Sequence, residues 1–129
     1  MVFNENCVGC HQVDGTGVPG EFPRLAGRAN KIAIDPRGRD FLIHLMLTGM
    51  SGKIMVDGRE ILGIMPSFVD LTDDDLAAAL NYVTGLEGGK IKPKPFMPEN
   101  LKEARRGPVS TPEEMAETRG RLAAAHVIP

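Results

Sequence analysis

The sequence predicts an all-α protein with three to four main helices, long connecting loops and a partly helical C-terminal extension. Segments 36–47 and 72–85 carry apolar residues at helical spacing and are flanked by residues that begin and end helices. Segment 13–27 contains four glycines and two prolines, so it is expected to be a loop. With 42% hydrophobic and 25% charged residues among its 129, the chain has the composition of a globular protein.

The N-terminal segment contains the motif Cys7-Val8-Gly9-Cys10-His11, directly after the end of a short amphipathic helix at residues 3–6. This is the attachment pattern of c-type haem. Each thiol can add across one vinyl group of haem, and the two-residue spacing on a helical turn lets both thiols reach one edge of the macrocycle. His11 is then held beneath the ring, where an imidazole nitrogen can bind iron as the proximal ligand.

Three other interpretations compete for this motif. A zinc knuckle needs two more ligands at similar spacing, and this chain has only two cysteines and distant histidines. A thioredoxin-like dithiol belongs in a βαβ context, which the sequence does not suggest. A chance match stays open at this point, because five residues make a short pattern.

The first long helix is expected to begin at Asp35-Pro36, with proline in the first turn, and to end at Gly49. Its apolar residues predict burial on nearly all sides. His44 lies inside this helix, and we interpret it as a packed or edge residue rather than a ligand. The apolar residues are Phe41, Leu42, Ile43, Leu45, Met46 and Leu47.

Between the two long helices, Asp57-Gly58 separates two brief apolar runs, which is a hairpin signal. The second helix begins at Thr72, an N-cap with Asp75 three residues later, and three acidic residues in its first turn suit the helix dipole. Gly85 is expected to end it. Its apolar stripe consists of Leu76, Ala79, Leu80 and Val83.

The composition changes after Gly88-Gly89, so we expect one domain at residues 1–89 and an extension at 90–129. The extension begins with Lys92-Pro93-Lys94-Pro95, a stiff extended linker. Two thinly apolar helices are predicted at about 99–106 and 112–125, the second capped by Thr111. We expect the extension to pack on the domain or on a partner and to be dispensable for haem binding.

Charge and hydropathy exclude several classes of function. The formal net charge is −2, so no basic excess indicates nucleic-acid binding, and no apolar run approaches the length of a membrane span.

Both cysteines belong to the haem motif, so disulfides are not expected. Because haem c is attached outside the bacterial cytoplasm, we expect a periplasmic protein. The chain is then a processed form whose signal peptide has been removed, or a domain cut from a longer polypeptide.

In three segments, which cover about residues 1–88 and fall in the family's order, the chain resembles a class I bacterial c-type cytochrome. The resemblance implies the cytochrome c fold, in which the main helices and long loops wrap around one haem. It also implies an aromatic contact between the first and last helices, through Phe3 and Tyr82. The matching segments are Phe3 with Asn6-Cys7-Val8-Gly9-Cys10-His11-Gln12, then Phe22-Pro23-Arg24-Leu25-Ala26-Gly27, then Gly63-Ile64-Met65-Pro66-Ser67-Phe68 with Leu71-Thr72.

The resemblance implies a ligand set for the haem iron. Cys7 and Cys10 would hold the haem covalently, and His11 would be the proximal ligand. Met65, directly before Pro66, would be the distal sulfur ligand. For any single methionine the alternative is a core-filling role, and six other methionines compete, Met50 and Met55 among them.

The resemblance also implies roles for residues of the loop after the motif. Pro23 would accept a hydrogen bond from the proximal imidazole and so fix its tautomer. Leu25 would press on the haem face. Arg24 and Arg28 are candidates to meet the haem propionates, with a solvated loop arginine as the alternative.

The function expected from these features is one-electron transfer by a monohaem cytochrome c, not catalysis, because two axial ligands leave the iron no open position. The expected partners are redox proteins, with a dehydrogenase as donor and a terminal oxidase or reductase as acceptor. One alternative is a haem enzyme or gas sensor with a labile distal ligand. Another is a cytochrome subunit or domain of a dehydrogenase complex.

Overall fold

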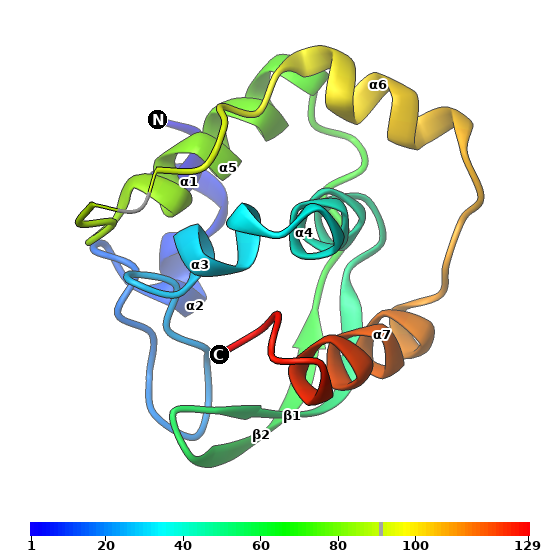
Figure 1. Ribbon diagram of the computed structural model, residues 1–129. Coiled ribbons are helices and arrows are strands. Elements are labelled where there is room, and N and C mark those ends of the chain that lie inside the picture. Colours follow the sequence, from blue (N-terminus) through cyan, green and yellow to red (C-terminus); the bar gives the residue numbers. More distant parts are fainter. Residues whose placement is uncertain (91) are drawn as a thin grey trace.

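The computed structural model describes residues 1–90 and 92–129, and consists of helices and one β-hairpin, which lies along one edge of the molecule (Figure 1). The predicted all-α class is confirmed, with the hairpin as an added element. Within the described residues no helix has the length and apolarity needed to cross a membrane. In chain order the elements are α1 (Val2–Asn6), α2 (Val8–His11), α3 (Ala29–Ile34), α4 (Pro36–Thr48), β1 (Met50–Val56), β2 (Arg59–Met65), α5 (Asp73–Gly85), α6 (Pro98–Arg106) and α7 (Pro112–Ala124).

Helix α4 runs through the middle of the molecule and has the bounds that the sequence predicts. Its N-cap is Asp35, whose carboxylate accepts a hydrogen bond from the backbone N–H of Arg37 at 2.8 Å. Gly49 follows the helix with a φ of 77°, a conformation that glycine adopts at little cost. Four of its apolar side chains are buried, so α4 contributes to the core on several sides: Phe41, Leu42, Ile43 and Met46.

Helix α5 begins as predicted, because the Thr72 hydroxyl accepts a hydrogen bond from the backbone N–H of Asp75 at 3.1 Å. All four residues of its predicted apolar stripe are buried. Helix α1 packs against α5, where the rings of Phe3 and Tyr82 lie 4.8 Å apart between centroids. The first helix of the chain is thereby fixed next to the haem motif.

The hairpin of β1 and β2 confirms the signal at Asp57-Gly58, and its arms are longer than the apolar runs suggested. Each strand has seven residues, and the register pairs Met50 with Met65 and Val56 with Arg59. Asp57 and Gly58 both have positive φ, 51° and 77°, as a type I′ turn requires. This register places Met65 at the open end of the hairpin, beside the start of β1.

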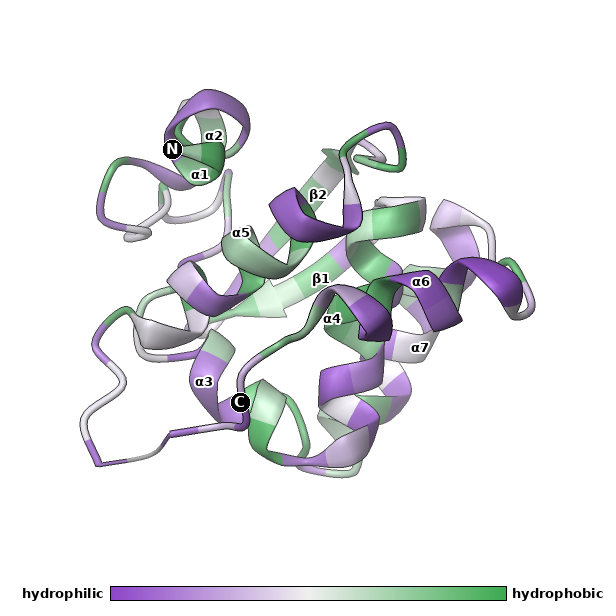
Figure 2. Ribbon diagram, turned by 90° about the horizontal axis from the view of Figure 1, so that it is seen from above, coloured by the Kyte–Doolittle hydropathy of each residue, from purple (hydrophilic) through white to green (hydrophobic). Residues whose placement is uncertain are grey.

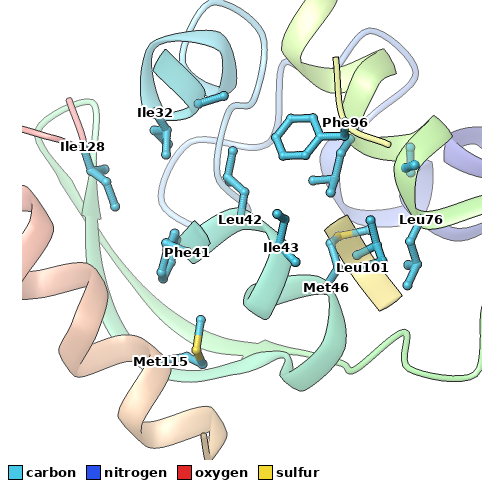
Figure 3. Packing of buried hydrophobic residues seen from close by; sticks show 14 of the residues in the cluster. Ile32, Phe41, Leu42, Ile43, Met46, Leu76, Phe96, Leu101, Met115 and Ile128 are labelled. Atoms are coloured by element: carbon cyan, nitrogen blue, oxygen red, sulfur yellow. The ribbon is translucent and has the colours of Figure 1, made fainter. Parts of the chain in front are cut away.

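The extension follows one side of the molecule from α5 past α6 to α7, which lies beside the hairpin (Figure 1). Its helices agree within a residue with the predicted ones, and the hydrophilic colouring of α6 in Figure 2 reflects their thin apolar faces. The few apolar side chains they carry nevertheless join the cluster built on α4 and α5. In Figure 3, Phe96 and Leu101 lie on one side of α4, and Met115 and Ile128 on the other. The apolar core is therefore continuous across position 89, and the domain boundary there stays a prediction.

Polar contacts hold the linker that precedes α6 in an extended path. The guanidinium of Arg39 donates to the carbonyls of Lys94 and Pro95, at 2.6 and 2.8 Å, and lies 4.1 Å from the centroid of the Phe96 ring. The amide of Asn81 bonds both the N–H and the carbonyl of Phe96, at 2.7 and 2.9 Å. Phe96 is thus inserted into the core while its backbone follows the surface of α4 and α5.

Replacing Leu101→Ala should lower the free energy of unfolding by about 2–5 kcal/mol, the usual cost of truncating a fully buried leucine. Leu101 is 0% exposed and belongs to the core cluster, although it lies in the extension. Denaturant unfolding followed by circular dichroism measures the change. The control is Val109→Ala, at a residue 87% exposed in the same extension, which should change stability by less than about 0.5 kcal/mol. Equal effects at both positions would contradict this packing of the extension.

Candidate functional site

One cavity brings together all seven site residues that the sequence indicates: Cys7, Cys10, His11, Pro23, Arg24, Leu25 and Met65. Cys7 is the N-cap of α2, and the others come from α2, from the loop before α3 and from the end of β2. The rest of the lining is mainly apolar and is contributed by α3, α4, the hairpin and α5. Its apolar side chains include Ile32, Phe41, Leu42, Leu45, Met46, Met50, Ile54, Ile61, Leu80 and Val83. A wide apolar cavity with nitrogen and sulfur ligands suits a flat macrocycle that carries a metal.

The short helix α2 places the three chemical groups of the motif. The backbone N–H of Cys10 donates to the carbonyl of Cys7 at 3.2 Å, and that of His11 donates to the same carbonyl at 2.9 Å. This turn puts both cysteines and the histidine on the cavity lining. His11 is 7% exposed, whereas Cys7 is half-buried and Cys10 is exposed. The thiols therefore lie toward the mouth of the cavity and the imidazole deeper inside.

The imidazole of His11 is oriented by the loop. Its Nδ1 donates a hydrogen bond to the carbonyl of Pro23 at 2.9 Å. Because a carbonyl can only accept, the proton sits on Nδ1 and the lone pair of Nε2 is left for a metal. Burial lowers the pKa of His11 more than the bond to Pro23 raises it, which favours the neutral, metal-binding form. Of the three histidines, all within the described part of the chain, His11 alone lines the cavity.

The loop reaches Pro23 by folding closely on itself at Gly17. The Gly17 N–H donates to the carbonyl of His11 at 2.9 Å, and the residue has a φ of 68°. A Cβ at this position would lie 2.5 Å from the carbonyl oxygen of Phe22 and 2.7 Å from that of Pro23. Only glycine allows this approach, so the glycine-rich composition of the loop serves the placement of the Pro23 carbonyl.

Met65 is held by the C-terminal end of α4. After Met65 the chain is fixed by two hydrogen bonds, from Ser67 Oγ to the carbonyl of Leu47 at 2.7 Å and from Phe68 N–H to that of Met46 at 2.9 Å. Gly49 lies against the same segment, and a Cβ there would be 2.5 Å from the carbonyl oxygen of Met65. The position of Met65 thus depends on the point at which α4 ends.

The structure also shows which of the methionines lie close enough to the cavity to compete with Met65 as a ligand. Met46, Met50 and Met65 line the cavity, and Met50 is the cross-strand neighbour of Met65. Met55 is 55% exposed and is absent from the lining. Met50 therefore remains close to the site, whereas Met55 does not. Met65 is the one of the three that is followed by proline.

Arg24 and Arg28 both line the cavity, and both are engaged by the hairpin turn. Arg24 donates to the two carboxylate oxygens of Asp57, each at 3.0 Å, and also to the carbonyl of Ala26. Hydrogen bonding to Arg24 lowers the pKa of Asp57. Arg28 is 5% exposed, lies 3.9 Å from Asp57 and donates to the carbonyl of Pro129. Neither arginine is a free solvated side chain of the loop.

One buried, charged residue of the lining is not among those singled out from the sequence: Arg119 of α7. The sequence did contain a signal for it. Met115, Arg119 and Leu122 are spaced by four and three residues, and all three are buried. An arginine in the apolar stripe of an amphipathic helix marks a buried charge, which requires a partner.

The structure also bears on two ligand roles considered from the sequence, His44 as a haem ligand and the Cys7–His11 motif as a zinc knuckle. His44 lies outside the cavity lining, with Nε2 3.5 Å from a carboxylate oxygen of Asp40 one helical turn away. In the part of the chain that the structure describes, no group of three or more histidine, cysteine, aspartate or glutamate side chains could hold a metal ion. The zinc-knuckle interpretation therefore has no cluster to rest on there.

Comparison with known proteins decides the family. The cytochrome c family model matches residues 1–87. The chain belongs to the cytochrome c family. It is similar to cytochrome c-552 of Thermus thermophilus, with 39% identity over 118 residues, 90% of each chain. It is also similar to a second cytochrome c-552, from a particular strain of the same species, with 39% identity over 118 residues, 90% of this chain and 80% of that protein.

Family membership confirms three predictions made from the sequence: the class I cytochrome c family, its fold and a haem c cofactor. This cytochrome carries one covalently bound haem c with its iron and functions in electron transport. The cavity suits that group. Two thiols lie at its mouth, a buried imidazole has Nε2 free, and its walls are mainly apolar.

Replacing Gly49→Ala should destabilise the protein by about 1–3 kcal/mol more than Gly58→Ala does. Both glycines have a φ of 77°, which costs an L side chain about 1–2 kcal/mol. The ψ of −170° at Gly49 adds to that cost, because this combination of angles is adopted essentially by glycine alone. Only the Cβ at position 49 meets the backbone at Met65, whereas at position 58 nothing lies within 4 Å. Thermal and denaturant unfolding of the holoprotein measure the difference. Equal destabilisation would mean that Gly49 does not hold the Met65 segment.

Proposed function

We propose that this cytochrome is a periplasmic one-electron carrier that accepts electrons from a dehydrogenase and passes them to a terminal oxidase or reductase. One observation carries the proposal: His11 of α2 and Met65 of β2 line the same cavity. The chain thereby offers two side-chain ligands for the two axial positions of the iron. When both positions are filled, no substrate can bind the metal, which favours a carrier over an enzyme.

In this proposal Cys7 and Cys10 hold the haem through thioethers. Cys10 is exposed, so the ring edge attached to it would lie near the surface. An exposed edge is what an electron carrier needs, because a partner must approach the ring closely without opening the protein. Leu25 would contact the ring from the loop side of the cavity.

His11 would bind the iron through Nε2, while Nδ1–H stays bonded to Pro23. A hydrogen bond on the far nitrogen fixes the orientation of the ring and makes the imidazole a more basic ligand. The imidazole is held from two directions, by the helical turn at Cys7 and by the loop folded at Gly17. This rigidity supports a carrier that rearranges little between the ferrous and ferric states.

Met65 would supply a thioether to the distal side. Haem iron carries the electron, and a soft thioether favours its ferrous state, so His/Met ligation raises the reduction potential. The hydrogen bonds at Ser67 and Phe68 keep the Met65 segment on the end of α4. They would oppose loss of the ligand and entry of small molecules.

The location and partners follow from the same chemistry. Thioether attachment of haem occurs outside the bacterial cytoplasm, which supports the periplasm. The chain has a net charge of −2, to which two propionates add negative charge, so partners with complementary basic patches would be favoured. Carriers of this kind form small and weak interfaces, which permit rapid exchange of partners. Residues 1–89 would form the haem domain and 90–129 its extension.

Replacing either Cys7→Ala or Cys10→Ala should leave haem attached through one thioether only. The remaining vinyl group stays conjugated with the ring, so the absorption bands of the denatured ferrous haem should move to longer wavelength. The double variant should lose covalent haem altogether. Mass spectrometry and haem staining after denaturing electrophoresis distinguish the forms. Covalent haem in the double variant would mean that other residues attach it.

Replacing Met65→Ala should open the distal side. The ferric sulfur-to-iron absorption band should disappear, ferrous iron should bind carbon monoxide readily, and the reduction potential should fall. Met65→His should keep the iron six-coordinate and lower the potential, because imidazole favours ferric iron more than a thioether does. Optical titrations of the purified holoprotein measure all three changes.

The controls are Met46→Leu, Met50→Leu and Met55→Leu, which conserve apolar volume. The first two lie on the cavity lining and the third on the surface. All three should keep the sulfur band and exclude carbon monoxide. If Met50→Leu removed the band while Met65→Ala kept it, the distal ligand would be Met50. Free binding of carbon monoxide by the wild type would instead favour a haem enzyme or gas sensor.

A further inference from the structure

Strand β2 forms an edge of the hairpin that no helix of the described chain covers extensively. Its partner strand β1 packs against α7, where a Cβ at Gly52 would lie 3.2 Å from the side chain of Ala116. Among the described elements, β2 makes extensive contact with β1 alone. Figure 1 shows the hairpin at the edge of the molecule, with α7 beside it. The hairpin therefore has an open edge at β2.

The backbone of this edge carries hydrogen-bonding groups that the hairpin does not use. Bonded and non-bonded pairs alternate along an antiparallel ladder, and the pair that flanks a two-residue turn, here Val56 with Arg59, is a bonded one. The register then places Glu60, Leu62 and Ile64 in non-bonded pairs, so their N–H and C=O groups face away from β1. None of the three makes a backbone hydrogen bond elsewhere in the described chain. An open row of donors and acceptors is a template for another strand.

The side chains of the open edge are unusual for a strand in contact with water. Leu62 and Ile64 are 75% and 79% exposed, although both are aliphatic. Natural proteins protect such edges with lysine, proline or inward-pointing charges. The stretch 61–65 contains none of these, and the nearest charge on the exposed face, that of Glu60, is paired with Lys53 at 3.2 Å. The edge thus has the chemistry of a contact surface.

We propose that β2 pairs with β2 of a second copy of this chain, antiparallel and about a two-fold axis at Leu62. Leu62 then lies opposite Leu62 of the partner subunit, and Glu60 lies opposite Ile64 of the partner subunit. The aliphatic side chains meet at the centre, and no like charges are directly opposed. A shift of the register in either direction would set Ile64 against the turn residue Gly58, or Glu60 against Pro66, which has no N–H. The proposed register therefore uses all the open backbone groups of both strands.

This pairing closes at two copies, because a two-fold contact uses the same surface on both subunits. The contact is short, so we expect a weak and concentration-dependent dimer. The axis is perpendicular to the sheet, so the cavities of both copies lie on the same side of it. Gly63 and Ile64 line the cavity as well as the open edge, which places both cavities beside the interface. This placement suits electron exchange between copies; that exchange, unlike the pairing itself, rests on the proposed carrier function.

The first test is the oligomeric state of the holoprotein. Sedimentation velocity between about 10 µM and about 1 mM should show a rapid equilibrium between monomer and dimer. Leu62→Lys sets like charges opposite each other and removes the apolar contact, so the dissociation constant should rise at least about tenfold. Val109→Lys is the matched control, because Val109 is 87% exposed but lies in the extension. A wild type that stays monomeric at about 1 mM, or equal effects of both variants, would overturn the proposal.

The second test distinguishes pairing of edges from stacking of the exposed faces. Hydrogen exchange measured by NMR should show that the amide of Leu62 exchanges quickly in dilute samples and is protected as the dimer forms. The amide of Met55 is the internal control, because its side chain lies on the exposed face while its N–H faces away from β2. Its exchange should not depend on concentration. A dimer that leaves exchange at Leu62 unchanged would contradict pairing through β2.

The third test addresses the register. Leu62→Lys and Leu62→Glu should each dimerise poorly, whereas an equimolar mixture should associate more tightly, because opposite charges then face each other across the axis. A mixture that associates no better than its components would overturn the proposed axis at Leu62. The sulfur band and the reduction potential should be the same in these variants as in the wild type. Changes in the band or potential would concern the carrier function, whereas the state of association decides the pairing.

Discussion

The hydrogen bond from His11 to the carbonyl of Pro23 is the interaction on which the arrangement of the site depends. It sets the tautomer of the imidazole and fixes where the loop must pass. That path requires a glycine at position 17, because any side chain there would meet the Pro23 carbonyl. The same loop carries Leu25, Arg24 and Arg28 to the cavity lining. A single backbone acceptor thus connects the ligand chemistry to the fold of the whole proximal side.

On the other side of the cavity, the position of the Met65 segment is set by α4, which contributes residues both to the apolar core and to the cavity lining. Phe41, Leu42 and Met46 belong both to the main apolar cluster and to the cavity lining. The end of the same helix holds the Met65 segment through Gly49 and two hydrogen bonds. Movement at the site would therefore disturb the packing of the core. In an electron-transport protein, such a coupling would limit the structural change that accompanies a change of oxidation state.

Features that depend on residues close together in the chain could be predicted from the sequence. The motif at residues 7–11 and the bounds of α4 and α5 follow from spacing, caps and periodicity. The length of the hairpin does not, because Leu62 and Ile64 are exposed and hide the alternation that marks a half-buried strand. Arg119 was missed for another reason. Its helix has a stripe that predicts burial, but only the tertiary arrangement shows that Arg119 lines the cavity while Met115 and Leu122 pack in the core.

The contact between Arg28 and Pro129 joins residues 101 positions apart in the sequence. Closing so large a loop has an entropic cost that is recovered only when the intervening chain is already ordered. The contact therefore forms at little entropic cost once the extension has packed on the core through residues such as Leu101 and Met115. In the folded chain the two ends of the sequence then meet beside the cavity, so that the C-terminal residues close the side on which Arg28 and Arg119 lie.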